Sequence, residues 1–161
     1  MASVSSNIHI GAPKEQVWEV LADLGGIYKW NPGVSSSHYT SEQTKGDGAT
    51  RHCDLVNPRG YLEERALEWR EGEGYVIDIY DSNLPIEKNV VTFSLTAEGD
   101  GTTVTVTPDY KLKYGLLGSL LDRLWARRQM QKGFDAMLAG LKHHVETGEL
   151  VGDKLPARAG A

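Results

Sequence analysis

Four glycine-containing turns divide the middle of the chain, and their spacing constrains the fold more than any other feature of the sequence. Glycine beside short polar residues or proline favours the tight connections of β-hairpins. The turns are 45–48, 57–60, 71–74 and 98–101. Beside them lie segments with the length and composition of strands, at 34–41, 49–56, 60–70, 74–81, 88–97 and 102–113. Because short turns join neighbouring strands antiparallel, the sequence predicts an antiparallel meander, with one longer, proline-containing loop over 81–87.

Helical spacing of apolar residues occurs on both sides of this meander. Near the start, apolar residues recur at helical intervals over 17–24, after Pro13, which suits the first turn of a helix. Gly25-Gly26 should end this helix, and a second short helix or turn is expected over 28–32. The apolar residues of 115–147 again recur at helical intervals, which predicts one long C-terminal helix.

The order of these segments predicts an α+β fold. A twisted sheet of about seven strands must bury one face, and the terminal helix is the element long enough to cover it. We therefore expect a seven-stranded antiparallel sheet wrapped around a long C-terminal helix, with two short helices after the first strand. A helix about 10 Å wide cannot fill the concave face of such a sheet, so space is expected between them.

The composition fits a single domain, expected over 1–150, with a flexible tail over 151–161. The net charge of −5 argues against a dedicated nucleic-acid surface. The single cysteine, Cys53, excludes an intrachain disulfide. The sequence has neither a secretory signal pattern nor an apolar run of roughly 18 residues, so we expect a cytoplasmic protein without integral membrane association. The histidines lack metal-site spacing and no nucleotide-binding motif occurs, so neither a metal nor a cofactor is expected.

Alternation along the strands predicts which side chains face the helix. In 102–107 Val104 and Val106 should point inward, and Thr103, Thr105 and Thr107 should point toward water. The same rule turns Val91 and Phe93 inward. In 74–81 the phase that places Ile77 inward competes with an opposite phase that fits nearly as well.

Two charged residues share this predicted inward side. Arg51 has the strand parity of Cys53 and Leu55, and Glu64 has the parity of the apolar residues in 60–69. Buried charges are unfavourable unless they are paired, so Glu64 is the expected partner of Arg51 on the adjacent strand. The pair either ties the two strands together or anchors a polar group of a ligand, and the sequence leaves both interpretations open.

Several short motifs occur along the chain in a fixed order. They are Ile10-x-Ala-Pro-x-x-x-Val-Trp18, Tyr28-x-Trp30-x-Pro32, Gly48-Ala-Thr-Arg51, Glu64-Arg65, Leu84-Pro85 ahead of Asn89, Gly101-Thr-Thr-Val-Thr105 and Leu120-Leu-Asp-Arg-Leu124. In this order and spacing the chain resembles the START-like or SRPBCC (helix-grip) superfamily, and within it the polyketide cyclase/dehydrase-like group. That superfamily includes lipid carriers, plant hormone receptors, pollen allergens, polyketide aromatase/cyclases and quinone chaperones. The resemblance implies a helix-grip fold with a cavity, but it does not imply one particular activity.

The fold and the resemblance together imply binding of a hydrophobic or aromatic small molecule, such as a lipid, polyketide or quinone-like compound, by a monomer or homodimer. The candidate ligand-binding residues are Trp30, Arg51, Cys53, Leu55, Glu64, Ile77, Leu84, Asn89, Val91, Phe93, Tyr110 and Met137. The alternative is a polyketide cyclase/dehydratase-type enzyme, in which Arg51 polarises a carbonyl and Glu64 or Tyr110 moves protons. A third interpretation is a protein that acts through partners, with an incidental cavity.

Overall fold

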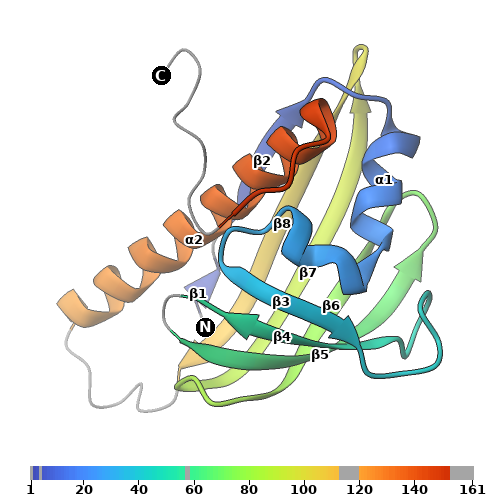
Figure 1. The fold of residues 1–161 in the computed structure, drawn as a ribbon. Helices are drawn as coiled ribbons and strands as arrows, with labels where there is room; N and C mark the ends of the chain where they lie inside the picture. Colours follow the sequence, from blue (N-terminus) through green and yellow to red (C-terminus); the bar gives the residue numbers. More distant parts are fainter. Residues whose placement is uncertain (1, 4, 57–58, 113–119, 153–161) are drawn as a thin grey trace.

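The chain forms an antiparallel sheet that curves around one long helix (Figure 1). The computed structural model describes residues 2–3, 5–56, 59–112 and 120–152. The strands are β1 (Ala2–Ser3), β2 (Ser6–Ile10), β3 (Val34–Tyr39), β4 (Thr50–Leu55), β5 (Gly60–Arg70), β6 (Gly74–Ser82), β7 (Ile86–Glu98) and β8 (Gly101–Leu112). The helices are α1 (Lys14–Ala22), the 3₁₀-helix η1 (Leu24–Lys29) and α2 (Leu120–Thr147).

The sheet has the predicted meander at its centre. Its order is β1-β8-β7-β6-β5-β4-β3, with every pair antiparallel, and β2 also pairs with β8. β1 and β2 pair with β8 in one continuous register, from Ala2 opposite Tyr110 to Ser6 opposite Val106, so together they occupy one strand position. The sheet therefore has seven strand positions, as predicted, and the α+β helix-grip architecture is confirmed.

The predicted loop over 81–87 is wrong in length. Only 83–85 lie outside strands, because β6 continues to Ser82 and β7 begins at Ile86. Ser82 pairs with Leu62 of β5 and Ile86 pairs with Leu112 of β8, so strand pairing on both sides shortens the loop.

The first two helices also differ in detail from the prediction. Pro13 lies at the N-cap of α1 with an extended ψ of 152°, so the helix begins at Lys14. Gly25 and Gly26 lie within η1, because α1 already ends at Ala22.

At the C-terminal end, α2 finishes at Thr147, as the sequence predicts. Its expected start at 115 lies outside the described residues, as does the part of the expected tail over 153–161. Val151 is buried and its N–H donates to the Lys29 carbonyl at 2.9 Å, so the chain still contacts the domain just beyond α2.

The predicted alternation is confirmed on the inner face of the sheet. Val104 and Val106 are fully buried, whereas Thr103, Thr105 and Thr107, which have the opposite phase, are half-buried. Val91 and Phe93 are buried in the same core. Ile77 also belongs to this core, so the phase of β6 is the one that turns Ile77 toward the helix.

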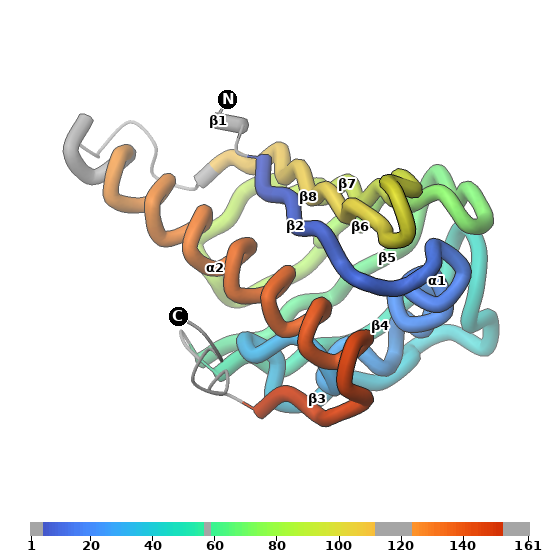
Figure 2. Tube along the Cα trace, turned by 90° about the horizontal axis from the view of Figure 1, so that it is seen from above, coloured from blue at the N-terminus to red at the C-terminus, as the bar shows by residue number. Residues whose placement is uncertain are grey.

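The C-terminal half of α2 is held tightly against the N-terminal part of the chain. Figures 1 and 2 show α2 running across the open side of the sheet, close to β2. Lys142 Nζ donates to the His9 carbonyl at 2.9 Å, and the Gly11 N–H donates to Glu146 Oε2 at 2.7 Å. A Cβ atom on Gly140 would lie 2.1 Å from the Trp30 carbonyl oxygen, so only glycine allows this close approach. Within the described ranges, no helix combines the length and apolar character needed to span a membrane.

Aromatic side chains fill the end of the fold beneath α1. The ring centroids of Trp18 and Trp69 are 5.2 Å apart, and Tyr75 lies 5.3 Å from Trp69 and 5.2 Å from Phe93. The Tyr75 hydroxyl donates to the Leu21 carbonyl at 2.9 Å, which fixes α1 to the sheet. Aromatic rings therefore occupy the core at this end of the fold.

Candidate functional site

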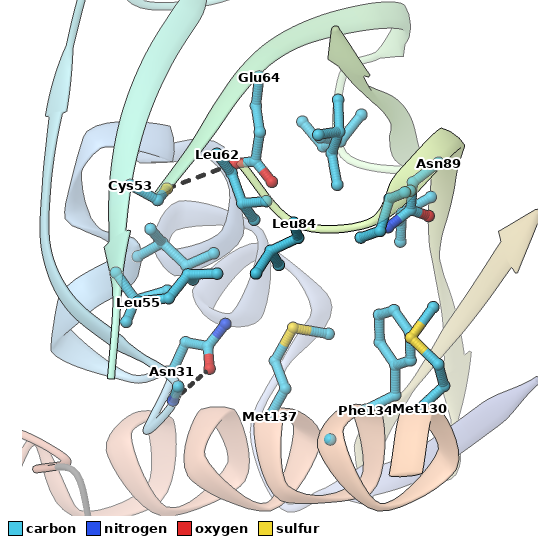
Figure 3. A pocket seen from close by; sticks show the side chains of 18 of the residues that line it. Asn31, Cys53, Leu55, Leu62, Glu64, Leu84, Asn89, Met130, Phe134 and Met137 are labelled. Atoms are coloured by element: carbon cyan, nitrogen blue, oxygen red, sulfur yellow. Dashed lines mark hydrogen bonds between the residues drawn. The ribbon is translucent and has the colours of Figure 1, made fainter. Parts of the chain in front are cut away.

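A cavity of about 380 Å³ lies between α2 and the inner face of the sheet. Figure 3 shows Met130, Phe134 and Met137 projecting from α2 toward side chains of the strands. The remaining wall residues are Ile27, Asn31, Gly33 and Val34 from the η1–β3 region, Arg51, Cys53, Leu55, Leu62, Glu64, Ile77 and Ile79 from β4 to β6, Leu84, Ile86, Asn89, Val91 and Phe93 from the turn and β7, and Gln129 and Gly133 from α2. The wall is mainly aliphatic, aromatic and thioether in character.

The two glycines within α2 lie in different surroundings. Gly140 lies against the Trp30 carbonyl, whereas a Cβ atom on Gly133 would meet no atom within 4 Å. Gly133 also lines the cavity. The helix is thus in close contact with the Trp30 carbonyl at Gly140. Two turns earlier, at Gly133, it borders open space.

Arg51 and Glu64 form the expected buried ion pair on this wall. They lie opposite each other on β4 and β5, with exposed fractions of 3% and 6%. Arg51 Nε donates to Glu64 Oε2 at 2.5 Å, and Arg51 Nη1 donates to the Leu24 carbonyl at 2.9 Å. The pair therefore links two strands and η1.

The electrostatics of this pair keep the guanidinium charged. Burial by itself would lower the pKa of Arg51, but the charge of Glu64, the neighbouring Cys53 and Tyr75 groups and the hydrogen bond to Glu64 together outweigh burial, so the pKa lies above its ordinary value. Cys53 Sγ donates to Glu64 Oε2 at 3.4 Å. Burial, followed by the charge of Glu64, raises the pKa of the Cys53 thiol well above its ordinary value, so it is a hydrogen-bond donor and not a nucleophile at neutral pH.

Asn89 supplies an uncharged polar group to the same cavity. It is 6% exposed on β7, opposite Tyr110 of β8. Its Oδ1 atom has no hydrogen-bond partner among the described residues. Figure 3 shows Asn89 on the sheet side of the cavity, across from α2.

The structure places the predicted ligand-binding residues on this wall, with two exceptions. Arg51, Cys53, Leu55, Glu64, Ile77, Leu84, Asn89, Val91, Phe93 and Met137 line the cavity. Their contact with a ligand remains a prediction.

Trp30 and Tyr110 lie away from the wall. The Trp30 side chain is 2% exposed and belongs to the core next to the closely packed half of α2, so it does not border the cavity. Tyr110 points inward from β8, one strand beyond the last cavity strand, and burial raises its pKa.

Some wall residues were not predicted as site residues from the sequence. Met130, Gly133 and Phe134 precede Met137 at helical intervals, and this spacing could have identified them. Asn31 and Gln129 carry no such signal, because both are polar. Asn31 follows the 3₁₀-helix η1, and Gln129 lies on an exposed turn of α2.

A second polar cluster lies on the outer face of the sheet, away from the cavity. His52 hydrogen-bonds to Glu63 through Nδ1 and to Asp54 through Nε2, the latter at 2.9 Å. These bonds, first that to Glu63 and then that to Asp54, raise the pKa of His52. Among the described residues, no three His, Cys, Asp or Glu side chains form a group suited to a metal ion.

Comparison with known proteins agrees with this architecture. A crystal structure of a protein from Thermus thermophilus has a TM-score of 0.77 at 23% identity and covers 91% of this chain and 99% of its own. A START superfamily protein from Mycobacterium smegmatis has a TM-score of 0.76 at 16% identity, covering 89% and 97%. XoxI from Bacillus cereus has a TM-score of 0.75 at 19% identity, covering 91% and 97%. At these identities the likeness shows the fold alone.

No curated protein matches the chain. The family model described as polyketide cyclase / dehydrase and lipid transport matches residues 1–146. This match covers nearly the whole chain and shows the family. The chain therefore belongs to the polyketide cyclase / dehydrase and lipid transport family.

Proposed function

We propose that this protein binds a hydrophobic or aromatic small molecule, such as a lipid, polyketide or quinone-like compound, in the cavity between the sheet and α2. The observation that carries the proposal is a cavity of about 380 Å³ with mainly apolar walls and a few polar groups. Ligand pockets typically measure about 300–1,000 Å³ and orient their ligands through a small number of polar groups. We further propose that the protein is cytoplasmic, that it is a monomer or homodimer, and that it does not bind nucleic acid.

A second candidate is cyclase or dehydratase chemistry, which the ion pair on the cavity wall favours. Protonated Arg51 can polarise a substrate carbonyl, and Glu64 is an acid–base group on the same wall. Arg51 already donates to Glu64 and to the Leu24 carbonyl, so a substrate oxygen would have to share the guanidinium.

Binding is tested with the purified protein by native mass spectrometry and by the fluorescence of an environment-sensitive lipophilic dye. The wild type should carry a co-purified compound or enhance the dye fluorescence. Gly133→Phe should lower dye affinity at least about tenfold, because its ring enters space that is empty in the wild type. Gly133→Ala adds one methyl group and is the matched control, which should retain binding. The absence of both a bound compound and a dye signal in the wild type would overturn the proposal.

Catalysis is tested by supplying a linear polyketide from a synthase and analysing the products by liquid chromatography and mass spectrometry. Wild-type protein should increase the share of cyclised or dehydrated product, and Glu64→Gln should remove this increase. Dye binding without any change in the product mixture would support binding and exclude this second candidate.

A further inference from the structure

The Asn89 side chain is a polar group on the cavity wall that the fold leaves unpaired. It points inward from β7 in the same phase as Val91 and Phe93, and all three line the cavity. The residue is 6% exposed, and Oδ1 has no partner among the described residues. Buried amides are hydrogen-bonded in nearly all folded proteins, so an unpaired amide beside a cavity points to a partner supplied by a ligand.

Other unpaired atoms in the described part of the chain do not adjoin this space. Trp30 Nε1 and His143 Nε2 are also buried without hydrogen-bond partners there. Neither residue lines the cavity, and the Trp30 indole is part of the packed core. Asn89 is therefore the residue with an unpaired buried atom that also lines the cavity.

The charge on the wall restricts what this ligand can be. Arg51 and Glu64 are the charged residues on the described wall, and they neutralise each other. A carboxylate ligand would be repelled by Glu64, and Arg51 is already paired with Glu64. A cationic ligand would have to separate this pair. Either would leave a charge unpaired among apolar side chains, which is strongly unfavourable. The wall therefore selects an uncharged ligand.

We propose that the ligand is an uncharged, largely apolar molecule whose hydroxyl group hydrogen-bonds to the Asn89 amide. A hydroxyl group both donates and accepts, so it can pair with the oxygen or the nitrogen of the amide. The apolar body of the ligand lies against Met130, Phe134 and Met137 of α2 (Figure 3). This inference rests on the proposed binding function and specifies the chemistry of its ligand.

The experiment compares 1-naphthol, naphthalene and 1-naphthoate, which share one ring system and differ in a hydroxyl group, a hydrogen atom or a carboxylate. Displacement of the lipophilic dye gives the affinity of each. Wild-type protein should prefer 1-naphthol to both others by about tenfold, the effect of one hydrogen bond in an apolar site. Asn89→Leu should bind 1-naphthol and naphthalene equally. It should also melt at the same or a higher temperature than wild type, because an apolar group replaces an unpaired amide.

Thr92→Val is the matched control, since Thr92 lies on the same strand with the opposite phase and outside the cavity. This variant should keep the wild-type preference for 1-naphthol. Dye binding with equal affinities for the three probes, or with the highest affinity for 1-naphthoate, would overturn the inference while leaving the proposed function intact. Failure of the wild type to bind the dye or any of the probes would overturn both.

Discussion

At the scale of single residues, the Arg51–Glu64 pair is the group most sensitive to change. Both side chains are almost completely buried, and their carboxylate and guanidinium are linked at 2.5 Å. Removing one partner of a buried pair leaves the other charge without compensation, which is far more costly than losing an exposed ion pair.

We therefore predict that Glu64→Gln lowers the free energy of unfolding by about 3 kcal/mol, measured by urea denaturation. Arg65→Gln is the matched control, because the Arg65–Asp78 pair at 2.8 Å lies on the exposed face of the neighbouring strands. The control should lose less than about 1 kcal/mol. Equal losses for the two variants would contradict the prediction.

His52 makes the stability of the outer face depend on pH. Hydrogen bonds to Glu63 and Asp54 raise its pKa in the folded protein. This contribution is fully present below the pKa of the unfolded chain, about 6.5, and is lost as pH rises through the higher folded-state pKa. The difference in unfolding free energy between wild type and His52→Asn should therefore shrink from about pH 5.5 to about pH 8.5. A difference that stays constant over this range would show that the imidazolium is not stabilised by its two carboxylates.

At the scale of secondary-structure elements, α2 has two different glycines. Gly140 allows contact with the Trp30 carbonyl, and Gly133 borders empty space. Glycine lowers helix stability by about 1 kcal/mol relative to alanine wherever it lies inside a helix. Both positions carry this penalty, but only Gly140 needs the absence of a side chain for packing.

We predict opposite effects for the two alanine substitutions. Gly133→Ala should raise the free energy of unfolding by about 1 kcal/mol, since the added methyl meets no atom. Gly140→Ala should lower it, because its Cβ would lie 2.1 Å from a backbone oxygen and α2 would have to move. Thermal and urea unfolding measure both changes. Stabilisation by Gly140→Ala would show that α2 does not approach η1 this closely.

At the scale of the whole molecule, aromatic side chains occupy one end of the fold and the cavity lies toward the other, which we call the hollow end. The aromatic cluster of Trp18, Trp69 and Tyr75 fills the space beneath α1, and the cavity begins beyond Phe93. A ligand that enters the hollow end supplies contacts that the free protein lacks, so binding and folding are coupled.

We predict that the dye stabilises the protein in proportion to its occupancy. At a free dye concentration about 100 times the Kd, the free energy of unfolding should rise by about 2.7 kcal/mol. Differential scanning calorimetry over a series of dye concentrations measures this change. At the same dye concentration Gly133→Phe should gain no more than about 1.4 kcal/mol, because its affinity for the dye is at least about tenfold lower. A similar rise in both proteins would indicate that the dye binds elsewhere.

Much of the candidate site could be predicted from strand alternation. A strand turns successive side chains to opposite faces, so the parity of Cys53 and Leu55 also places Arg51, and the parity of Val91 and Phe93 also places Asn89. Alternation does not apply to Trp30, which follows η1, and it does not decide whether Tyr110 borders the cavity. Both point inward and are buried, but facing inward does not specify whether a side chain meets the helix, the core or the cavity.

The sequence by itself determined the elements, their antiparallel order and the inward side of each strand, because these depend on turn residues and on periods of two or 3.6 residues. Only the tertiary structure decided where the cavity lies and which inward side chains border it. That outcome depends on how closely α2 approaches the rest of the fold, in contact at Gly140 and separated at Gly133. This separation results from packing between segments far apart in the sequence, which no local pattern encodes.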